Sequence, residues 1–164
     1  MKSGRILLAS VLFVGACFAQ TEKPSSQEEH FYRLDYVVKE VDGARVVNSR
    51  NYSTMISTGH VSEIRTGSKV PVSSDNKVEY MDIGVNVDSR RPRELENQLA
   101  LEISAEISSV ASGEARSGEP PRVRQNRWQA DVLLPLRRPV VVFSSDDPGS
   151  THKMQLEVTA TQIK

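Results

Sequence analysis

Alternation of apolar and polar residues is the feature that most constrains how this chain can fold. From residue 99 to residue 107 every second residue is apolar, and polar residues such as Glu102, Ser104 and Glu106 lie between them. Successive side chains of a β-strand point to opposite faces, so this pattern predicts a strand with one face buried. The alternation recurs at residues 31–41, 128–134 and 154–160. The sequence therefore predicts an all-β protein.

Turn signals separate the predicted strands. Asp42-Gly43 lies between residues 31–41 and 44–57 and predicts a hairpin, because glycine accepts the positive φ of a tight turn. Thr58-Gly59 and Asp146-Asp147-Pro148-Gly149 predict two further turns. Short strands joined by turns are typical of an antiparallel β-sandwich or a partly open barrel. We expect residues 31–164 to form one such domain.

The middle of the chain is less regular. Residues 60–65 predict a short strand that ends at Thr66-Gly67, and residues 78–87 predict a second strand. The apolar residues change parity at Met81-Asp82, which predicts a β-bulge. Residues 89–97 are rich in charge, so a turn is expected there.

The first 19 residues have the three parts of a signal peptide. Lys2 and Arg5 form a basic start, residues 6–16 are apolar, and a small residue precedes the expected cut between Ala19 and Gln20. Residues 20–30 are polar and are expected to form a disordered arm. The chain is therefore predicted to be exported to the periplasm or outer membrane, or secreted.

Cys17 allows a second interpretation of the same segment. Val14-Gly15-Ala16-Cys17 resembles a lipobox, in which Cys17 would carry a lipid anchor and become the first mature residue. We favour cleavage after Ala19 and keep lipidation of Cys17 as the alternative. Because Cys17 is the only cysteine, no disulfide can form within the chain.

The balance of charge argues against nucleic acid as a partner. Of the 21 Lys and Arg residues, Lys2 and Arg5 lie in the predicted signal peptide, which leaves 19 against 21 acidic residues. Recognition of phosphates needs a basic excess. Two arginine-rich stretches nevertheless suggest local contacts with a partner, and the candidate residues are Arg90, Arg91, Arg122 and Arg124.

No pattern predicts a catalytic or metal site, and no cofactor is expected. His30, His60 and His152 do not have the spacing of zinc ligands. Asp146-Asp147 suits a tight turn better than a cation site, because aspartate bonds to nearby amides. The serine pairs lack the surroundings of a nucleophile elbow. Trp128 alternates in phase with Val132 and is predicted to lie in the core.

The succession of motifs resembles the core domain of secretins, the ring-forming outer-membrane channels of bacterial secretion systems. The resemblance covers residues 67–143. It rests on Gly67-Ser-Lys-Val-Pro71, Val78-Glu-Tyr-Met-Asp-Ile-Gly84, the alternating strand at 99–107 followed by Ser108-Ser109, Pro121-Arg-Val-Arg124, residues 130–134 and Arg138-Pro139-Val-Val-Val. Secretins carry a Gly-Gly pair after the last of these strands, where this chain has Phe143-Ser144-Ser145-Asp146. The chain thus resembles a reduced secretin without pore-forming hallmarks.

The resemblance implies a non-enzymatic protein of the cell envelope. Such a domain would bind a partner protein or assemble with copies of itself in the periplasm or outer membrane. Exposed strand edges would serve for docking, because their unpaired backbone groups accept an added strand. The alternative from another class is a secreted β-sandwich that binds a carbohydrate or another small ligand.

Overall fold

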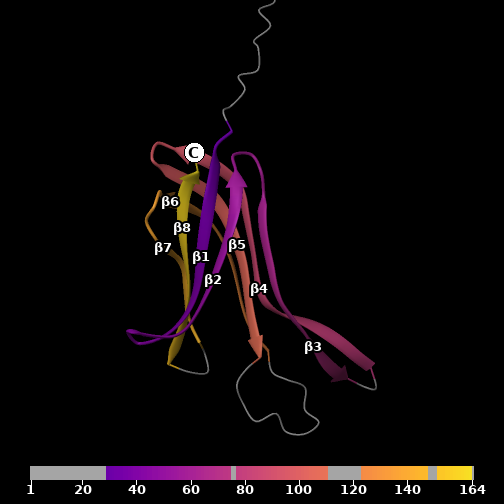
Figure 1. Cartoon of the computed structure of the whole chain (residues 1–164). Helices are drawn as coiled ribbons and strands as arrows, with labels where there is room; N and C mark the ends of the chain where they lie inside the picture. Colours follow the sequence, from indigo (N-terminus) through magenta and orange to yellow (C-terminus); the bar gives the residue numbers. More distant parts are fainter. Residues whose placement is uncertain (1–28, 75–76, 111–122, 148–150, 164) are drawn as a thin grey trace, which may run out of the picture.

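The computed structural model describes residues 29–74, 77–110, 123–147 and 151–163. Within these ranges the chain forms eight strands and no helix (Figure 1). The strands build two four-stranded antiparallel sheets that pack as a sandwich, so the predicted all-β class is confirmed. The first sheet has the order β2-β1-β8-β7 and the second β3-β4-β5-β6. The strands are β1 (Phe31–Asp42), β2 (Arg45–Ser57), β3 (Ser62–Ser74), β4 (Lys77–Leu95), β5 (Gln98–Val110), β6 (Val123–Pro135), β7 (Val140–Asp146) and β8 (His152–Ile163).

The core lies between the inner faces of the two sheets. β1 contributes Tyr32, Leu34 and Tyr36, and the alternating residues of β5 are buried as their pattern predicts. Burial of such side chains is the main favourable term in the stability of a domain that has no disulfide. The buried core residues of the other strands are Ile56, Val85, Val87, Leu134, Leu156, Val158 and Ala160.

One polar contact joins the two sheets inside the core. The Tyr36 hydroxyl of β1 and the Ser89 hydroxyl of β4 lie 2.5 Å apart, and both side chains are buried. A hydrogen bond there satisfies polar groups that would otherwise be buried without a partner. Burial raises the pKa of Tyr36 to about 12, while the bond to Ser89 opposes the rise. The phenol therefore stays neutral and can act as the donor.

In the middle of the chain, the predicted short strand at residues 60–65 and the predicted β-bulge at Met81-Asp82 are wrong. β3 does not end at Thr66-Gly67, since it pairs with β4 without a break as far as Ser74. No bulge occurs at Met81-Asp82 either. The parity changes because the ends of β3 and β4 extend beyond the sandwich, where no core selects one face of the strand (Figure 1).

The predicted charged turn at residues 89–97 is also wrong. β4 continues through this segment to Leu95, and only Glu96 and Asn97 form the turn before β5. The β4–β5 register shifts between Arg90 and Arg93, so a bulge occurs there, with Arg91 at a φ of 51°. A bulge changes the direction of the side chains around it, and at this bulge they include those of Arg90, Arg91 and Arg93.

Candidate functional site

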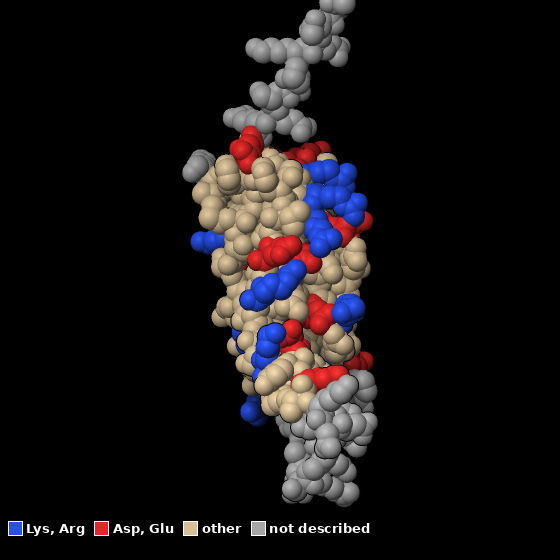
Figure 2. Space-filling view, turned by 90° about the vertical axis from the view of Figure 1, so that its right-hand side faces the viewer, with Lys and Arg blue, Asp and Glu red and all other residues tan. Residues whose placement is uncertain are grey.

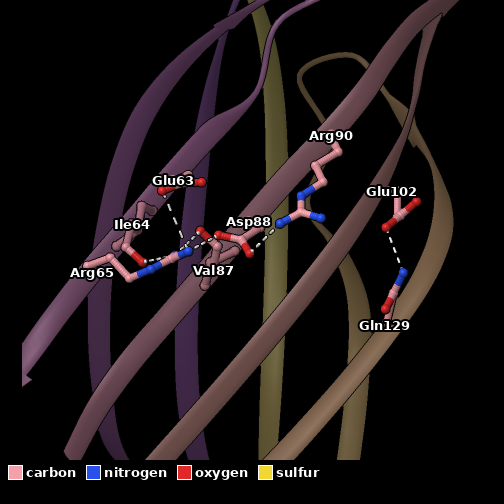
Figure 3. Close-up of polar contacts among 8 residues, drawn as sticks. All are labelled: Glu63, Ile64, Arg65, Val87, Asp88, Arg90, Glu102 and Gln129. Carbon is pink, nitrogen blue, oxygen red and sulfur yellow. Dashed lines mark hydrogen bonds and ion pairs between the residues drawn. The ribbon is translucent and has the colours of Figure 1, made fainter. Parts of the chain in front are cut away.

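The outer face of the second sheet carries a network of charged side chains. We call it the charged face and define it by Glu63, Arg65, Asp88, Arg90 and Glu102 (Figure 3). Arg65 lies 2.5 Å from Asp88 and 3.6 Å from Glu63, and Arg90 contacts the same Asp88 at 3.1 Å. Asp88 therefore bridges two arginines from neighbouring strands. Most of these groups are exposed, so each pair adds little stability.

Glu102 is the most buried acidic group of this face. Its side chain is only 7% exposed, it forms an ion pair with Arg91, and it accepts a 2.6 Å hydrogen bond from Gln129. The alternation in β5 predicted an open, solvated face at this position. The bulge in β4 and the long side chain from β6 cover it instead, so the carboxylate of Glu102 is buried and compensated.

Glu106, four residues farther along β5, is held in its ionised form. It forms an ion pair with Arg127, whose Nε donates a 2.8 Å hydrogen bond to it. The bond from Arg127 lowers the pKa of Glu106, and a bond from Gln125 adds to this effect. Stabilisation by this group is thus present at neutral pH and is lost as the pH falls through the lowered pKa.

The structure does not bring the predicted partner-binding arginines together. Arg90 and Arg91 lie at the β4 bulge, whereas Arg124 lies near the start of β6 and forms a 2.7 Å ion pair with Asp147. Their partner residues on β5, Glu102 and Ser109, are seven residues apart, or about 24 Å along the strand. Arg122 lies outside the described residues. The arginines therefore mark two separate regions.

The strand order leaves four edges open in the described part of the chain. β2 and β7 are the edges of the first sheet, and β3 and β6 are the edges of the second. An edge strand presents unpaired N–H and C=O groups to which another strand can bond. A stack of Trp128 on Phe143, with ring centroids 5.4 Å apart, packs β6 against β7. Trp128 packs against the core, as predicted.

The β3–β4 hairpin projects beyond the sandwich (Figure 1). β5 pairs with β4 only from Val85 onward, so the preceding residues of β4 pair with β3 alone. Val78, Tyr80 and Met81 on this extension are exposed, with Tyr80 at 68%. The sequence does not predict this extension, because Thr66-Gly67 indicates the end of the strand that begins at residue 60.

A pocket of about 240 Å³ lies between the sheets at the end opposite the β4–β5 turn. Its charged groups are paired: Lys153 contacts Asp146 at 3.0 Å, and His152 contacts Glu40 at 2.6 Å. Arg124 of the Arg124–Asp147 pair also lines it. No local sequence pattern predicts this pocket, since its lining comes from five strands.

The histidines do not form a common site. His30 contacts Glu94 at 2.5 Å, His60 contacts the Ser57 hydroxyl at 2.8 Å, and His152 lies at the other end of the sandwich. In the described ranges, no three His, Cys, Asp or Glu side chains gather in a way that could hold a metal ion. Asp146 and Asp147, weighed above as cation ligands, contact Lys153 and Arg124 instead.

Glu94 at the end of the sandwich is in contact with His30, and the buried Tyr32 lies nearby. The hydrogen bond with His30 lowers the pKa of Glu94. Burial raises the pKa of Tyr32 to about 12, and the nearby carboxylate of Glu94 adds to this effect.

Nothing in the described residues forms a helix long and apolar enough to cross a membrane.

Comparison with known proteins identifies the fold. Neither protein-family models nor curated protein sequences give a match. Among solved structures, the chain is similar to the injectisome secretin InvG of Salmonella, with 9% identity, a TM-score of 0.52, and coverage of 83% of this chain and 62% of that one. It is also similar to the type II secretin GspD of enteropathogenic Escherichia coli, with 11% identity, a TM-score of 0.50, and coverage of 83% and 66%.

A third similar structure contains InvG within the Salmonella injectisome basal body, together with PrgH and PrgK. Its TM-score is 0.52 at 9% identity, and the match covers 83% of this chain and 44% of that one. This chain therefore spans from under half to about two thirds of the length of these secretins. The described domain is secretin-like in fold, as the succession of sequence motifs predicted.

Proposed function

We propose that this chain is a non-enzymatic, exported protein of the cell envelope whose secretin-like domain assembles with copies of itself or with a partner protein. The observation that carries the proposal is the secretin-like sandwich with an open edge on both sides of each sheet. At this level of identity the likeness gives the fold, and function has to be argued from surfaces.

The open edges support head-to-tail assembly. β3 and β6 lie on opposite sides of the second sheet, so β3 of one copy and β6 of the next can extend that sheet. Contacts between two different surfaces repeat from copy to copy, and they close into a ring when the rotation permits. Backbone hydrogen bonds would supply the affinity, and side chains of the charged face would set the register.

The arginine-rich regions are proposed as contacts for a partner. Arg90 and Arg91 lie at the β4 bulge, and Arg124 lies near the start of β6 at the opposite end of the sandwich. Arg122, two residues before Arg124 in the sequence, is proposed with them. Because Arg90, Arg91 and Arg124 have acidic partners within the domain, an acidic partner protein would have to exchange these ion pairs. Such exchange changes specificity more than affinity.

The solution mass of residues 20–164 tests the proposal. Light scattering coupled to size exclusion should show a large closed assembly that persists as the concentration is lowered. If the chain is a monomer at all concentrations, self-assembly is wrong. Crosslinking in the native envelope then tests for a partner protein, and its absence there removes the proposal.

The pocket between the sheets favours a second candidate, a module that binds a small polar ligand such as a sugar. Its mixed set of donors and acceptors, with Arg124, Asn126 and Glu40, could bond to hydroxyl groups. A saturable signal on a glycan array that is lost in Arg124→Ala, with no protein partner in crosslinking, would favour this candidate over assembly.

A further inference from the structure

One end of the sandwich carries exposed apolar side chains on several elements. We call it the N-terminal end, because β1 begins there. It also holds the end of β8 and the β4–β5 turn (Figure 1). The large exposed apolar residues at this end are Phe31, Val61, Leu95, Leu133 and Ile163. Isolated apolar residues are common on protein surfaces, whereas a group at one end of a domain indicates a contact.

The register places some of these side chains in two groups, one on each outer face of the sandwich. On the first sheet, Phe31 of β1 lies directly opposite Ile163 of β8. On the second, Leu133 of β6 lies opposite Ala100, which in turn lies opposite Arg93 of β4. Opposed residues share a face of the sheet, so Leu133 and Arg93 flank Ala100 on the outer face. Apolar groups therefore occur on both outer faces at the same end.

Arginines without acidic partners accompany these apolar side chains. Arg93, Arg137 and Arg138 are exposed. No carboxylate of the described residues lies within ion-pair distance of them. The acidic groups at this end are Glu94, which is engaged by His30, Glu29, which lies 3.4 Å from His60, and Glu96, which is exposed on the turn. Figure 2 shows this end uppermost, with a broad uncharged area, a cluster of Lys and Arg side chains beside it, and Asp or Glu side chains at its upper edge.

The backbone at this end is held in place by hydrogen bonds between the connections. The Leu136 amide donates to the Asn97 carbonyl, the Arg137 amide to the Ala160 carbonyl, and the Thr58 amide to the His30 carbonyl, at 3.3, 2.7 and 3.1 Å. These bonds link the β4–β5 turn, the β6–β7 connection, β8, the β2–β3 turn and the segment before β1. The exposed side chains thus stand on a rigid base, which lowers the entropy cost of binding.

We propose that the N-terminal end docks end-on to an anionic phospholipid membrane. The apolar side chains would enter the interface between headgroups and acyl chains, and Arg93, Arg137 and Arg138 would contact lipid phosphates. A basic residue near an anionic surface contributes about 1 kcal/mol, so Arg93, Arg137 and Arg138 would attract such a surface. Of the three glutamates at this end, Glu29 and Glu94 are engaged by His60 and His30, and Glu96 opposes the attraction. Apolar burial adds to this attraction. The chain that precedes Phe31 joins the domain at this end, so a tether upstream would present the same surface.

Vesicle sedimentation tests the proposal with residues 20–164, which contain every described residue and lack Cys17. The probes are vesicles of phosphatidylcholine alone and of phosphatidylcholine mixed with phosphatidylglycerol. We expect binding to the anionic vesicles only, weakened by added salt because salt screens charge. The variant Arg93→Glu/Arg137→Glu/Arg138→Glu should bind at least about tenfold more weakly. Leu95→Ser/Leu133→Ser should also lose binding, because it removes apolar burial.

The opposite end offers a matched control. Val46 is as exposed as Leu95, at 51%, and Arg45 beside it in the β1–β2 hairpin is also exposed. Arg45→Glu/Val46→Ser should bind vesicles as the parent chain does. Thermal unfolding shows which variants are folded. If either the arginine variant or the leucine variant fails to fold, the other still tests the proposal. The proposal is wrong if the folded parent chain does not bind anionic vesicles. It is also wrong if Arg45→Glu/Val46→Ser loses as much binding as the variants at the N-terminal end.

Discussion

At the scale of single residues, the close pairing of β3 with β4 depends on Gly67 and Gly84, which lie opposite each other. A Cβ atom added to Gly84 would lie 2.0 Å from the Thr66 carbonyl oxygen, and one added to Gly67 would lie 2.2 Å from the Ile83 carbonyl oxygen. Backbone atoms cannot move aside as a flexible side chain can. Gly84→Ala should therefore lower the free energy of unfolding by about 1–3 kcal/mol or more, measured by urea denaturation.

Gly43 provides the control for this substitution. It has a φ of 59°, and nothing lies within 4 Å of a Cβ built there. Asparagine tolerates this conformation, so Gly43→Asn should change stability only slightly. If Gly84→Ala unfolds at the same urea concentration as the parent chain, the close approach of the two strands is not as described.

The ionised Glu106 leads to a prediction about pH. Its pKa is lowered in the fold by Arg127, so it binds fewer protons there than in the unfolded chain. Its stabilisation should be present above pH 4.5 and should fade as the pH falls through the lowered pKa. Glu106→Gln should be less stable than the parent chain at pH 7 by at most about 1 kcal/mol, because the pair is near the surface.

Denaturation of both proteins between pH 3 and pH 7 checks this prediction. The two stability curves should converge at the acid end, where the parent carboxyl group is protonated and resembles the amide. A difference that stays constant over the whole range would mean that the charge of Glu106 is not the cause.

At the scale of the strands, the stack of Trp128 on Phe143 joins the edges of the two sheets. Its nearly parallel rings belong to β6 and β7, which share no ladder of backbone bonds. Phe143→Ala should cost about 2–4 kcal/mol of stability, because a cavity remains beside the indole. Phe143→Leu keeps most of the apolar volume and should cost less. Equal losses in the two variants, measured by urea denaturation, would show that filling the space is unimportant.

The sequence predicted those strands whose inner face is opposite a complete core. The alternating residues of β5 and β8 fixed both the type of element and its buried face, and Asp42-Gly43 fixed the β1–β2 hairpin. β3 and β4 were predicted too short. Pro71 is tolerated because β3 is an edge strand, and the Arg-rich segment continues as a strand because a bulge absorbs the irregularity.

The candidate site was less predictable for a related reason. Periodicity assigns Arg91 and Glu102 to exposed positions on their own strands, and only the β4–β5 register brings them into contact. The pocket beside Arg124 likewise gathers residues from strands far apart in sequence. Cross-strand neighbours depend on strand order and register, and the shift of the β4–β5 register between Arg90 and Arg93 does not follow from the periodicity of either strand alone.

At the scale of the whole molecule, the surfaces proposed for assembly and for membrane contact face different directions. The edges β3 and β6 point sideways, the N-terminal end carries apolar side chains with arginines, and the β3–β4 hairpin extends the opposite end (Figure 1). Lateral assembly through the edges and end-on contact with a membrane would therefore use different surfaces. Substitutions at the sheet edges should therefore leave membrane binding unchanged, and substitutions at the N-terminal end should leave assembly unchanged.

Proline substitutions in β6 test whether this edge carries the assembly. Consecutive N–H groups of a strand point to opposite sides, so of Ala130 and Asp131 one bonds toward β5 and the other points outward. A proline at the outward position removes only the free edge donor. One of Ala130→Pro and Asp131→Pro should therefore keep the thermal stability of the parent chain yet lower its solution mass toward that of a monomer. A variant of parent stability that assembles as before would mean that β6 is not the contact, and that copies meet through another surface.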